Sequence, residues 1–250
     1  QPERELVVVK PEDANRSSNA NKEVFLTWLC SVLKCDPPEV EGSTDGKRMT
    51  AQLAILEEAL KKAEIQVVRQ DIMDKARFMR DEVWYAEVKI GDEIYSGIEL
   101  LGDGDSEVSI FTKDPDTGVK CKIRPDFLPK KRQIIVDLKT TQDASYEAFC
   151  KSVANYGYHT QDAFYGLVES WYSGRGRRPM LFLVVQSEPP YEVAFYELDA
   201  QARQAGEQKV RRGLEIWRRC EESRKWPGVG WDWEAGAYTL QRVTLPKWAL

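Results

Sequence analysis

The sequence predicts an α/β domain with a mixed β-sheet. Apolar residues recur at helical spacing near both ends of the 250-residue chain, and its middle holds short runs of strand-forming residues separated by turn residues. We find no internal repeat and no low-complexity linker. No apolar run approaches the roughly 18 residues that a membrane helix needs, and the first ten residues are too weakly apolar for a secretory signal.

Two helices are expected in the first third of the chain, at 21–34 and 48–80, where apolar residues fall at three- and four-residue spacing. The segment between them is rich in turn-forming residues. Short strands should follow within 83–100, around the turn Gly91-Asp92. The remaining expected elements are strands at 106–112, 118–126 and 133–139, a long helix at 145–172, strands at MLFLVVQ and EVAFYEL, and an amphipathic helix at 199–224.

Charge and cysteine usage limit the function classes. The chain has 36 Lys+Arg and 41 Asp+Glu, a formal net charge of −5, so any nucleic-acid binding must come from a local basic surface. Basic residues do cluster locally, between Lys120 and Arg132, at Arg175, Arg177 and Arg178, and from Arg203 to Lys225, whereas 81–107 is acidic. Each basic cluster taken singly could equally be a solvated helix or loop surface. Five cysteines without a CxxC pair are typical of a reducing cytosol, and we expect a cytoplasmic protein without a structural zinc or iron–sulfur cluster.

The most informative stretch is residues 118–141. If 118–126 and 133–139 pair as a hairpin around the PKKR turn, Asp126 lies directly opposite Asp137. Cross-strand partners have Cβ atoms about 4.5–5.5 Å apart, and two carboxylates this close repel one another. A divalent cation would relieve that repulsion, and oxygen ligands suit Mg²⁺ or Mn²⁺.

Strand alternation predicts the directions of the neighbouring side chains. Asp137 and Lys139 should project to one face, with Leu138 pointing into the core. A lysine beside a metal-binding carboxylate can orient or deprotonate a water and stabilise developing negative charge. The alternative is a surface hairpin with a scattered Asp and Lys, because a bare D-x-K sequence is common.

A helical motif follows downstream. Gln161 and Tyr165 are four residues apart and share one helix face, where an amide and a phenol could hold a phosphate or a base edge. Alternatively, this segment is an ordinary amphipathic helix with Phe164 and Tyr165 in the core. His159 is the only histidine, and we expect it to be packed or hydrogen-bonded rather than a metal ligand.

Taken in series, RPD, DLKTT and YHTQDAFY resemble the nuclease domain of the RecE-type exonucleases (exonuclease VIII), in the PD-(D/E)XK superfamily that also contains RecB-like nucleases. The similarity extends from about Ser106 to the C-terminus. It implies a restriction-endonuclease-like core, a central mixed β-sheet flanked by helices. It also implies one nuclease domain over 1–250, with a mainly helical part at 1–80 and the catalytic core and C-terminal helix and tail in 81–250.

The activity implied by this resemblance is Mg²⁺- or Mn²⁺-dependent 5′→3′ degradation of linear double-stranded DNA, leaving 3′ single strands for recombination. The implied partners are a single-strand-annealing recombinase of the RecT type and further copies of the chain, in a ring such as a tetramer. A membrane partner is not expected.

The resemblance also implies roles for individual residues. Asp126 and Asp137 match the metal-binding acids, and the backbone carbonyl of Leu138 matches the usual third protein ligand. Lys139 matches the motif lysine, and Gln161 and Tyr165 match the Q-xxx-Y element, which completes the implied catalytic set.

Four further residues are candidates for supporting roles. Glu107 matches a recurring acid, with acid–base support and a structural hydrogen bond both open. Arg124, Thr140 and Thr141 are candidates for DNA binding, including a pocket for the 5′ phosphate.

One feature of the family has no counterpart in the sequence. RecE-type and RecB-like nucleases carry a further active-site histidine in a segment resembling G-x-A-x-H-x-x-x-L-E-P, which is not found between Gln1 and Leu250. The alternative function is therefore a DNA-end-binding or ring-forming module with impaired cleavage. A third possibility is a structure-specific endonuclease of the same superfamily.

Overall fold

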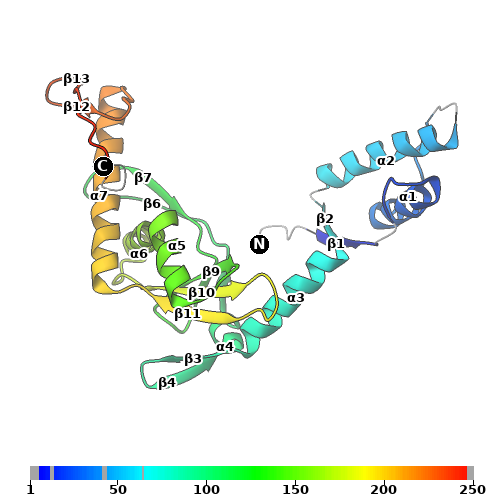
Figure 1. Cartoon of the computed structure of the whole chain (residues 1–250), viewed down its shortest axis with the longest axis horizontal. Helices are drawn as coiled ribbons and strands as arrows, with labels where there is room; N and C mark the ends of the chain where they lie inside the picture. The colour runs from blue at the N-terminus through cyan, green and yellow to red at the C-terminus, as the bar shows by residue number, and fades with distance from the viewer. Residues whose placement is uncertain (1–5, 12–13, 41–43, 64, 247–250) are drawn as a thin grey trace. The chain divides into compact units, whose positions relative to one another are not determined.

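A computed structural model describes residues 6–11, 14–40, 44–63 and 65–246 (Figure 1). The chain folds into two compact units, the first formed by 1–86 with 186–192 and the second by 87–185 with 193–250.

The first unit contains two packed helices and a small parallel sheet. Helices α1 (Asn19–Leu33) and α2 (Asp45–Lys62) bury a leucine-rich core between them. Strands β1 (Leu6–Lys10) and β2 (Ile65–Arg69) pair in parallel, and α3 (Gln70–Tyr85) follows β2 directly.

The prediction of one helix over 48–80 is therefore wrong. The segment IQVVR within it forms β2, because its β-branched residues favour extended structure and β1 supplies a strand partner. That partner lies more than fifty residues away in the sequence, so a search for local periodicity cannot detect the pairing.

The second unit is built on a five-stranded mixed sheet flanked by helices, as the sequence and the family resemblance predict. Its strand order is β11-β10-β9-β8-β5. The bounds are β5 (Gly104–Ser106), β8 (Phe127–Pro129), β9 (Ile135–Thr141), β10 (Met180–Gln186) and β11 (Val193–Glu197). Strand β9 occupies the centre of this order and carries the DLKTT motif.

Two smaller hairpins precede the central strand. Strands β3 (Glu87–Ile90) and β4 (Glu93–Ser96) pair around Gly91-Asp92, as predicted, and lead into the short helix α4 (Gly97–Leu101). Strands β6 (Ile110–Lys113) and β7 (Lys120–Ile123) form a separate antiparallel pair across the DPDTG turn. In the tail, β12 (Trp231–Asp232) and β13 (Ala237–Tyr238) also pair.

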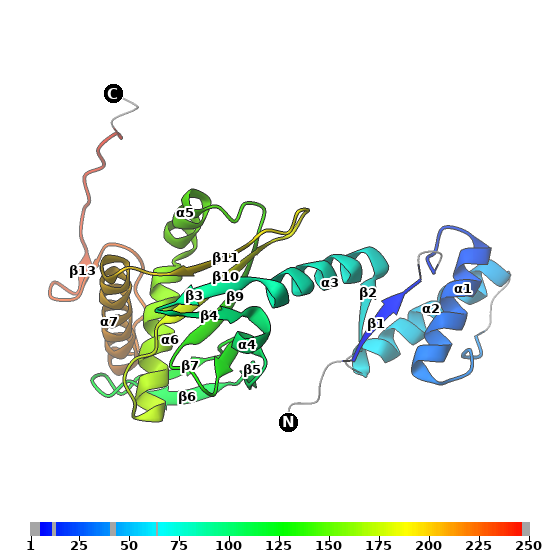
Figure 2. The same cartoon turned by 90° about the horizontal axis from the view of Figure 1, so that it is seen from below.

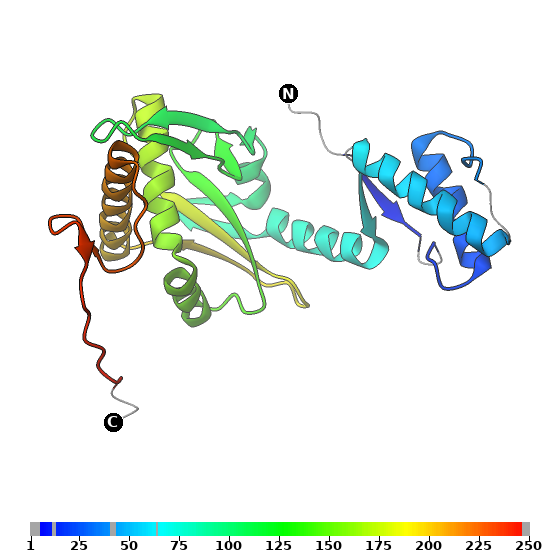
Figure 3. The same ribbon diagram turned by 90° about the horizontal axis from the view of Figure 1, so that it is seen from above.

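The longer helices of this unit are α5 (Tyr146–Tyr156), α6 (Tyr158–Ser173) and α7 (Ala200–Ser223). In Figures 2 and 3, α6 lies between α7 and the sheet. Apolar side chains of α6 share a core with β6, β7 and α7, while Phe149 of α5 stacks on Tyr196 of β11 with ring centroids 4.5 Å apart. Helix α6 is therefore packed against the β6–β7 hairpin and α7.

The predicted helix at 145–172 is two helices. Gly157 has φ +71°, a left-handed conformation that glycine adopts at little cost, and it ends α5 and begins α6. The predicted helix at 199–224 is confirmed as α7. No helix in the described part of the chain is both long and apolar enough to cross a membrane.

Candidate active site

The register between β8 and β9 places two carboxylates opposite each other. Phe127 pairs with Val136 in the antiparallel ladder, so the next positions in that register are Asp126 and Asp137. The Asp126 carboxylate also accepts a hydrogen bond from the backbone N–H of Leu138, at 2.8 Å. This register is the one predicted from the sequence.

The strand predicted at 118–126 differs in its partners. Residues Lys120–Ile123 pair with β6 rather than with β9, and β9 is paired instead by the three-residue strand β8. A proline at position 125 removes a backbone donor from the segment between β7 and β8, which explains why one continuous strand does not form.

Strand β9 changes from buried to exposed within the DLKTT motif. Ile135, Val136 and Asp137 are almost completely buried, whereas Leu138 is 49% exposed. The prediction that Leu138 points into the core is therefore wrong. Asp137 and Lys139 face α6, so Leu138 lies on the opposite face, and β8 is too short to cover this half of β9.

Asp137, Lys139 and Gln161 form one connected cluster. The Lys139 ammonium lies 2.5 Å from Asp137 Oδ2 and donates to Gln161 Oε1 at 3.1 Å. The Gln161 amide in turn donates to Asp137 Oδ1 at 2.6 Å. Gln161 therefore contacts both predicted active-site groups of β9 and fixes their positions relative to α6.

Burial of Asp137 shapes the electrostatics of this cluster. Loss of solvent raises the pKa of its carboxyl group, Lys139 and Gln161 act in the opposite direction, and the charge of Asp126 raises it again. Asp137 Oδ2 is buried and has no hydrogen-bond partner of proper geometry among the described residues, although the ammonium is close. A buried carboxylate oxygen in this state would be stabilised by additional positive charge.

Tyr165 lies beside the cluster and has one part in the core and one part near the candidate site. Its ring packs against the core, and its phenol oxygen lies near the backbone of Arg124, two residues before Asp126. Burial raises the pKa of this phenol, so it is a neutral hydroxyl at physiological pH. The core role and the site role proposed for Tyr165 are therefore compatible.

Glu107 is brought next to Asp126 through the backbone. Its N–H donates to the Asp126 carbonyl at 3.1 Å, and its carboxylate pairs with Arg124 Nε at 2.6 Å. The backbone of Glu107 has φ +55°, a left-handed conformation that is unusual for a residue with a side chain. These contacts form a structural connection that holds the segment entering β8.

Of the three predicted DNA-binding residues, Thr140 and Thr141 lie at the end of β9, and Arg124 lies between β7 and β8. Thr140 is exposed, and the Thr141 hydroxyl donates to the backbone carbonyl of Asp143 at 3.0 Å. Arg124 is engaged with Glu107, so it is not a free cation. His159 is buried, and its Nδ1 lies 3.2 Å from the Val153 carbonyl, which agrees with the hydrogen-bonding role expected for it.

The sequence-based reasoning missed Tyr158. Its ring lies under the Lys139 ammonium, 4.5 Å from centroid to nitrogen, at a distance where a cation is attracted to the aromatic face. The signal was present, because Tyr158, Gln161 and Tyr165 recur at three- and four-residue spacing and so share one face of α6.

The donor set can be tested against a divalent metal ion. The described residues contain no group of three or more His, Cys, Asp or Glu side chains arranged to hold a metal. Asp126, Asp137 and the Leu138 carbonyl nevertheless offer only oxygen donors, which Mg²⁺ and Mn²⁺ prefer, and Mg²⁺ is commonly held by one or two carboxylates.

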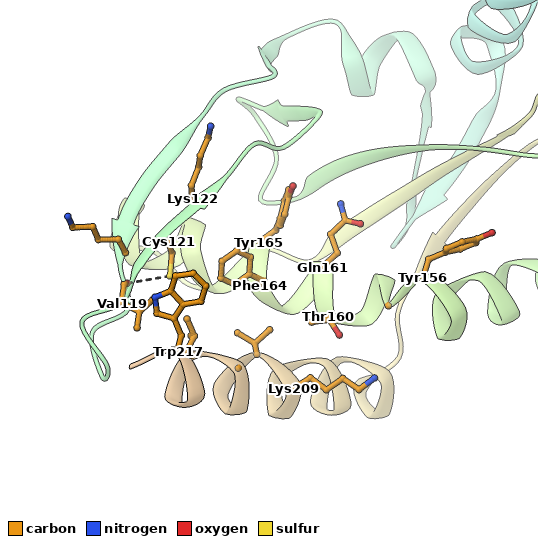
Figure 4. A pocket seen from close by; sticks show the side chains of 15 residues that line it. Val119, Cys121, Lys122, Tyr156, Thr160, Gln161, Phe164, Tyr165, Lys209 and Trp217 are labelled. Atoms are coloured by element: carbon orange, nitrogen blue, oxygen red, sulfur yellow. Dashed lines mark hydrogen bonds between the residues drawn. The ribbon is translucent and has the colours of Figure 1, made fainter. Parts of the chain in front are cut away.

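A groove of about 660 Å³ adjoins the cluster (Figure 4). Gln161 and Tyr165 line it, together with residues of β7, of α7 and of the end of α5. In Figure 4 both side chains project from the same side of α6, away from α7. The groove therefore continues from the candidate active site along the helices.

The sheet, the opposed aspartates and the lysine two residues after the second aspartate define a nuclease-like domain of the PD-(D/E)XK type. The chain belongs to the DUF3799 family, described as a PDDEXK-like domain of unknown function, whose model matches residues 41–232. No curated protein sequence matches it. A crystal structure from Eubacterium rectale, named "Putative exonuclease", is similar with a TM-score of 0.46 and 15% identity, over 94% of this chain and 96% of that chain.

Proposed function

We propose that this protein is a divalent-metal-dependent exodeoxyribonuclease that degrades linear double-stranded DNA 5′→3′ and leaves 3′ single strands for recombination. One observation carries the hydrolytic part of the proposal. Asp126 and Asp137 face each other across β8 and β9, with the Lys139 ammonium 2.5 Å from Asp137 on the same face. The substrate and the polarity rest on the resemblance to RecE-type exonucleases.

In this proposal Asp126, Asp137 and the Leu138 carbonyl hold Mg²⁺ or Mn²⁺. Such an ion, when bound, polarises the phosphate and lowers the pKa of the attacking water. Lys139 donates hydrogen bonds to the nucleophile or to the phosphate oxygens, where negative charge develops. Tyr158 and Gln161 hold the lysine in position, one through its ring and the other through its amide oxygen.

The test is nucleotide release from linear duplex DNA by wild type and by Asp137→Asn and Lys139→Ala. We expect Mg²⁺-dependent release by wild type and a loss of at least about 100-fold in each variant, since each removes a group that acts on the reacting atoms. Asp92→Asn and Lys89→Ala, on the exposed β3–β4 hairpin, are matched controls and should cleave like wild type.

The substrate form distinguishes the competing functions. Loss of linear but not closed-circular DNA supports an exonuclease, and end-labelled duplexes report its polarity. Cutting of circular DNA would favour the structure-specific endonuclease. Tight binding of DNA ends without any cleavage, in Mg²⁺ and in Mn²⁺, would refute the nuclease and favour the end-binding or ring-forming module.

The proposal extends to assembly. A ring of several copies around DNA, acting with a single-strand-annealing protein of the RecT type, is what the family resemblance implies. Light scattering of the purified chain tests the ring, because a monomeric mass at micromolar concentration contradicts it. Co-purification with an annealing protein encoded beside it tests the second partner.

A further inference from the structure

The groove beside the candidate active site is formed by three elements. Strand β7 supplies one wall, with residues of 119–122, and α7 supplies another, with a stripe from Lys209 to Trp217. Helix α6 supplies the floor, from Gly157 to Tyr165. Each helical stripe spans about 12 Å at about 1.5 Å per residue, so the groove is long enough for a short extended segment.

The charge of the groove differs from that of the chain. Lys209 of α7 lines the groove and is exposed. Lys120 and Lys122 border it only along β7, because their side chains alternate with buried Cys121 and so lie on the other face of that strand (Figure 4). None of the described lining residues is an Asp or a Glu, although the chain carries a net charge of −5. The groove therefore offers a cation at Lys209 and no opposing carboxylate among its described lining residues.

Aromatic side chains line the groove together with Lys209. Tyr156 is 73% exposed and Trp217 is 48% exposed, and both line the groove (Figure 4). Phe164 contributes a third, partly buried ring. Exposed flat rings beside a lysine form the combination on which unpaired bases stack while a phosphate meets the cation.

Gly213 leaves open space on the α7 wall of the groove. It lies in the interior of α7, where glycine is less favourable than alanine by about 0.5–1 kcal/mol. A Cβ atom placed there would meet no other residue within 4 Å, so packing does not require glycine. Since Gly213 lines the groove, its missing side chain keeps the α7 wall accessible.

The walls are held together at one end. Arg211 of α7 donates to Asp114 at 3.1 Å and to Asp116 at 2.8 Å, in the turn between β6 and β7. Asp114 is buried and also accepts a hydrogen bond from the Thr117 N–H at 3.1 Å. This ion pair fixes the β6–β7 hairpin against α7, so the groove is preformed.

We propose that this groove binds single-stranded DNA, with bases stacked on Trp217 and Tyr156 and a phosphate at Lys209. The groove is continuous with the candidate active site through Gln161, which lines it and also contacts Asp137. The proposal rests on the proposed nuclease function, since it names the form in which a strand lies next to the reacting groups. A base-paired duplex hides the base faces that these rings would contact.

The test measures binding without cleavage. Fluorescence anisotropy of a labelled oligo(dT) is recorded with the full chain in EDTA, for wild type, Lys209→Glu and Gly213→Leu. Lys209→Glu reverses a cation, and Gly213→Leu fills the groove at a helix position with open space. We expect each to weaken binding about tenfold or more at low salt.

Arg212→Glu is the matched control. It makes the same charge change on α7 at an exposed residue that does not line the groove, and it should change affinity less than about threefold. Gly213→Ala controls for helix stability and should bind closer to wild type than Gly213→Leu. Unfolding curves establish that each variant is folded.

Three results would overturn the proposal. The first is oligo(dT) binding by Gly213→Leu and Lys209→Glu equal to that of Arg212→Glu. The second is an equal effect on a blunt hairpin duplex, which would mean that unpaired bases are not recognised. The third is an effect confined to an acidic peptide, which would assign the groove to a protein partner. Cleavage is assayed separately. If folded wild type cleaves no DNA, while both variants lose oligo(dT) binding, only the nuclease function is refuted and the binding proposal stands.

Discussion

The side-chain amide of Gln161 donates a 2.6 Å hydrogen bond to Asp137, while its oxygen accepts from Lys139 at 3.1 Å. A residue of α6 thus holds the buried carboxylate and the lysine of β9 at the same time. Both hydrogen bonds require the amide in one orientation, with nitrogen toward the acid and oxygen toward the ammonium.

Gln161→Met should impair cleavage while the fold and DNA affinity are kept. The thioether has a similar size, but it cannot donate to Asp137 and accepts only weakly from Lys139. We expect a fall of about 10- to 100-fold in the cleavage rate, the usual effect of removing a residue that orients metal-binding groups. Gln208→Met, at an exposed glutamine of α7, should cleave like wild type.

The same variant should shift the acid limit of activity. Burial raises the pKa of Asp137 above its ordinary value of 3.8, and the Gln161 hydrogen bond opposes that shift. Activity should therefore be lost as pH falls and Asp137 becomes protonated, and the midpoint of this loss should move to higher pH in Gln161→Met, which lacks the opposing hydrogen bond. A pH–rate profile with an unchanged acid limb in the variant would contradict this assignment.

Divalent metal should stabilise the protein. The repulsion between Asp126 and Asp137 and the burial of Asp137 both oppose folding of the charged site, and a bound cation offsets them. At a metal concentration of about 100 times Kd we expect a rise in Tm of about 5–10 °C for a chain of this size. Asp137→Asn should abolish the rise in a thermal-shift experiment, whereas Asp92→Asn should preserve it.

Two glycines of α7 should respond in opposite ways to alanine. A Cβ atom at Gly206 would lie 1.9 Å from the His159 carbonyl oxygen, so α6 and α7 would have to separate. Gly206→Ala should destabilise the protein by about 2–3 kcal/mol. Gly213→Ala should stabilise it by about 0.5–1 kcal/mol, because the space is open and alanine favours the helix. Urea unfolding measures both, and equal effects would contradict the packing described here.

Arg177→Ala, which removes the ion pair with Asp162, should destabilise the protein less in acid than near neutral pH. Asp162 is 1% exposed and accepts from Arg177 at 2.9 Å and from the Met180 N–H at 3.0 Å. Removing the arginine leaves a buried carboxylate without its cation, which costs about 3–5 kcal/mol near neutral pH. Arg175→Ala, in the same loop and exposed, is the control.

The sign of the pH effect follows from the raised pKa. Burial raises the pKa of Asp162 above 3.8, so the folded state binds its proton more tightly than the unfolded state does. Protonation of Asp162 therefore stabilises the folded state as pH falls. This gain in stability is larger in Arg177→Ala, because the buried carboxylate has lost its cation. The difference in unfolding free energy between wild type and Arg177→Ala should shrink from about pH 7.5 to about pH 4.5.

The sequence predicted the central part of the site because its geometry is local. Asp126 and Asp137 belong to one hairpin, and its register follows from the position of the PKKR turn. The partner of β7 and the helix break at Gly157 were not predicted. The first depends on packing of β6 against α6, and the second on a single left-handed residue within an otherwise helical pattern.

The groove could not be predicted from local sequence patterns either. Lys120 and Trp217 are nearly a hundred residues apart, and they share a cavity only because α6 and α7 pack together through Gly206. Each basic cluster read from the sequence could equally have been an ordinary solvated surface. The tertiary contacts decide which lysines face exposed rings.

The seven residues of strand β9 serve two purposes. Ile135 and Val136 fill the protein interior, and the candidate active site begins at Asp137. Mutations in the first half are then constrained by shape, whereas those from Leu138 onward leave the interior undisturbed. A homologue could therefore lose catalytic activity and still keep the same fold. Among such homologues, loss of Asp126, Asp137, Lys139 or Gln161 would be expected in the inactive members.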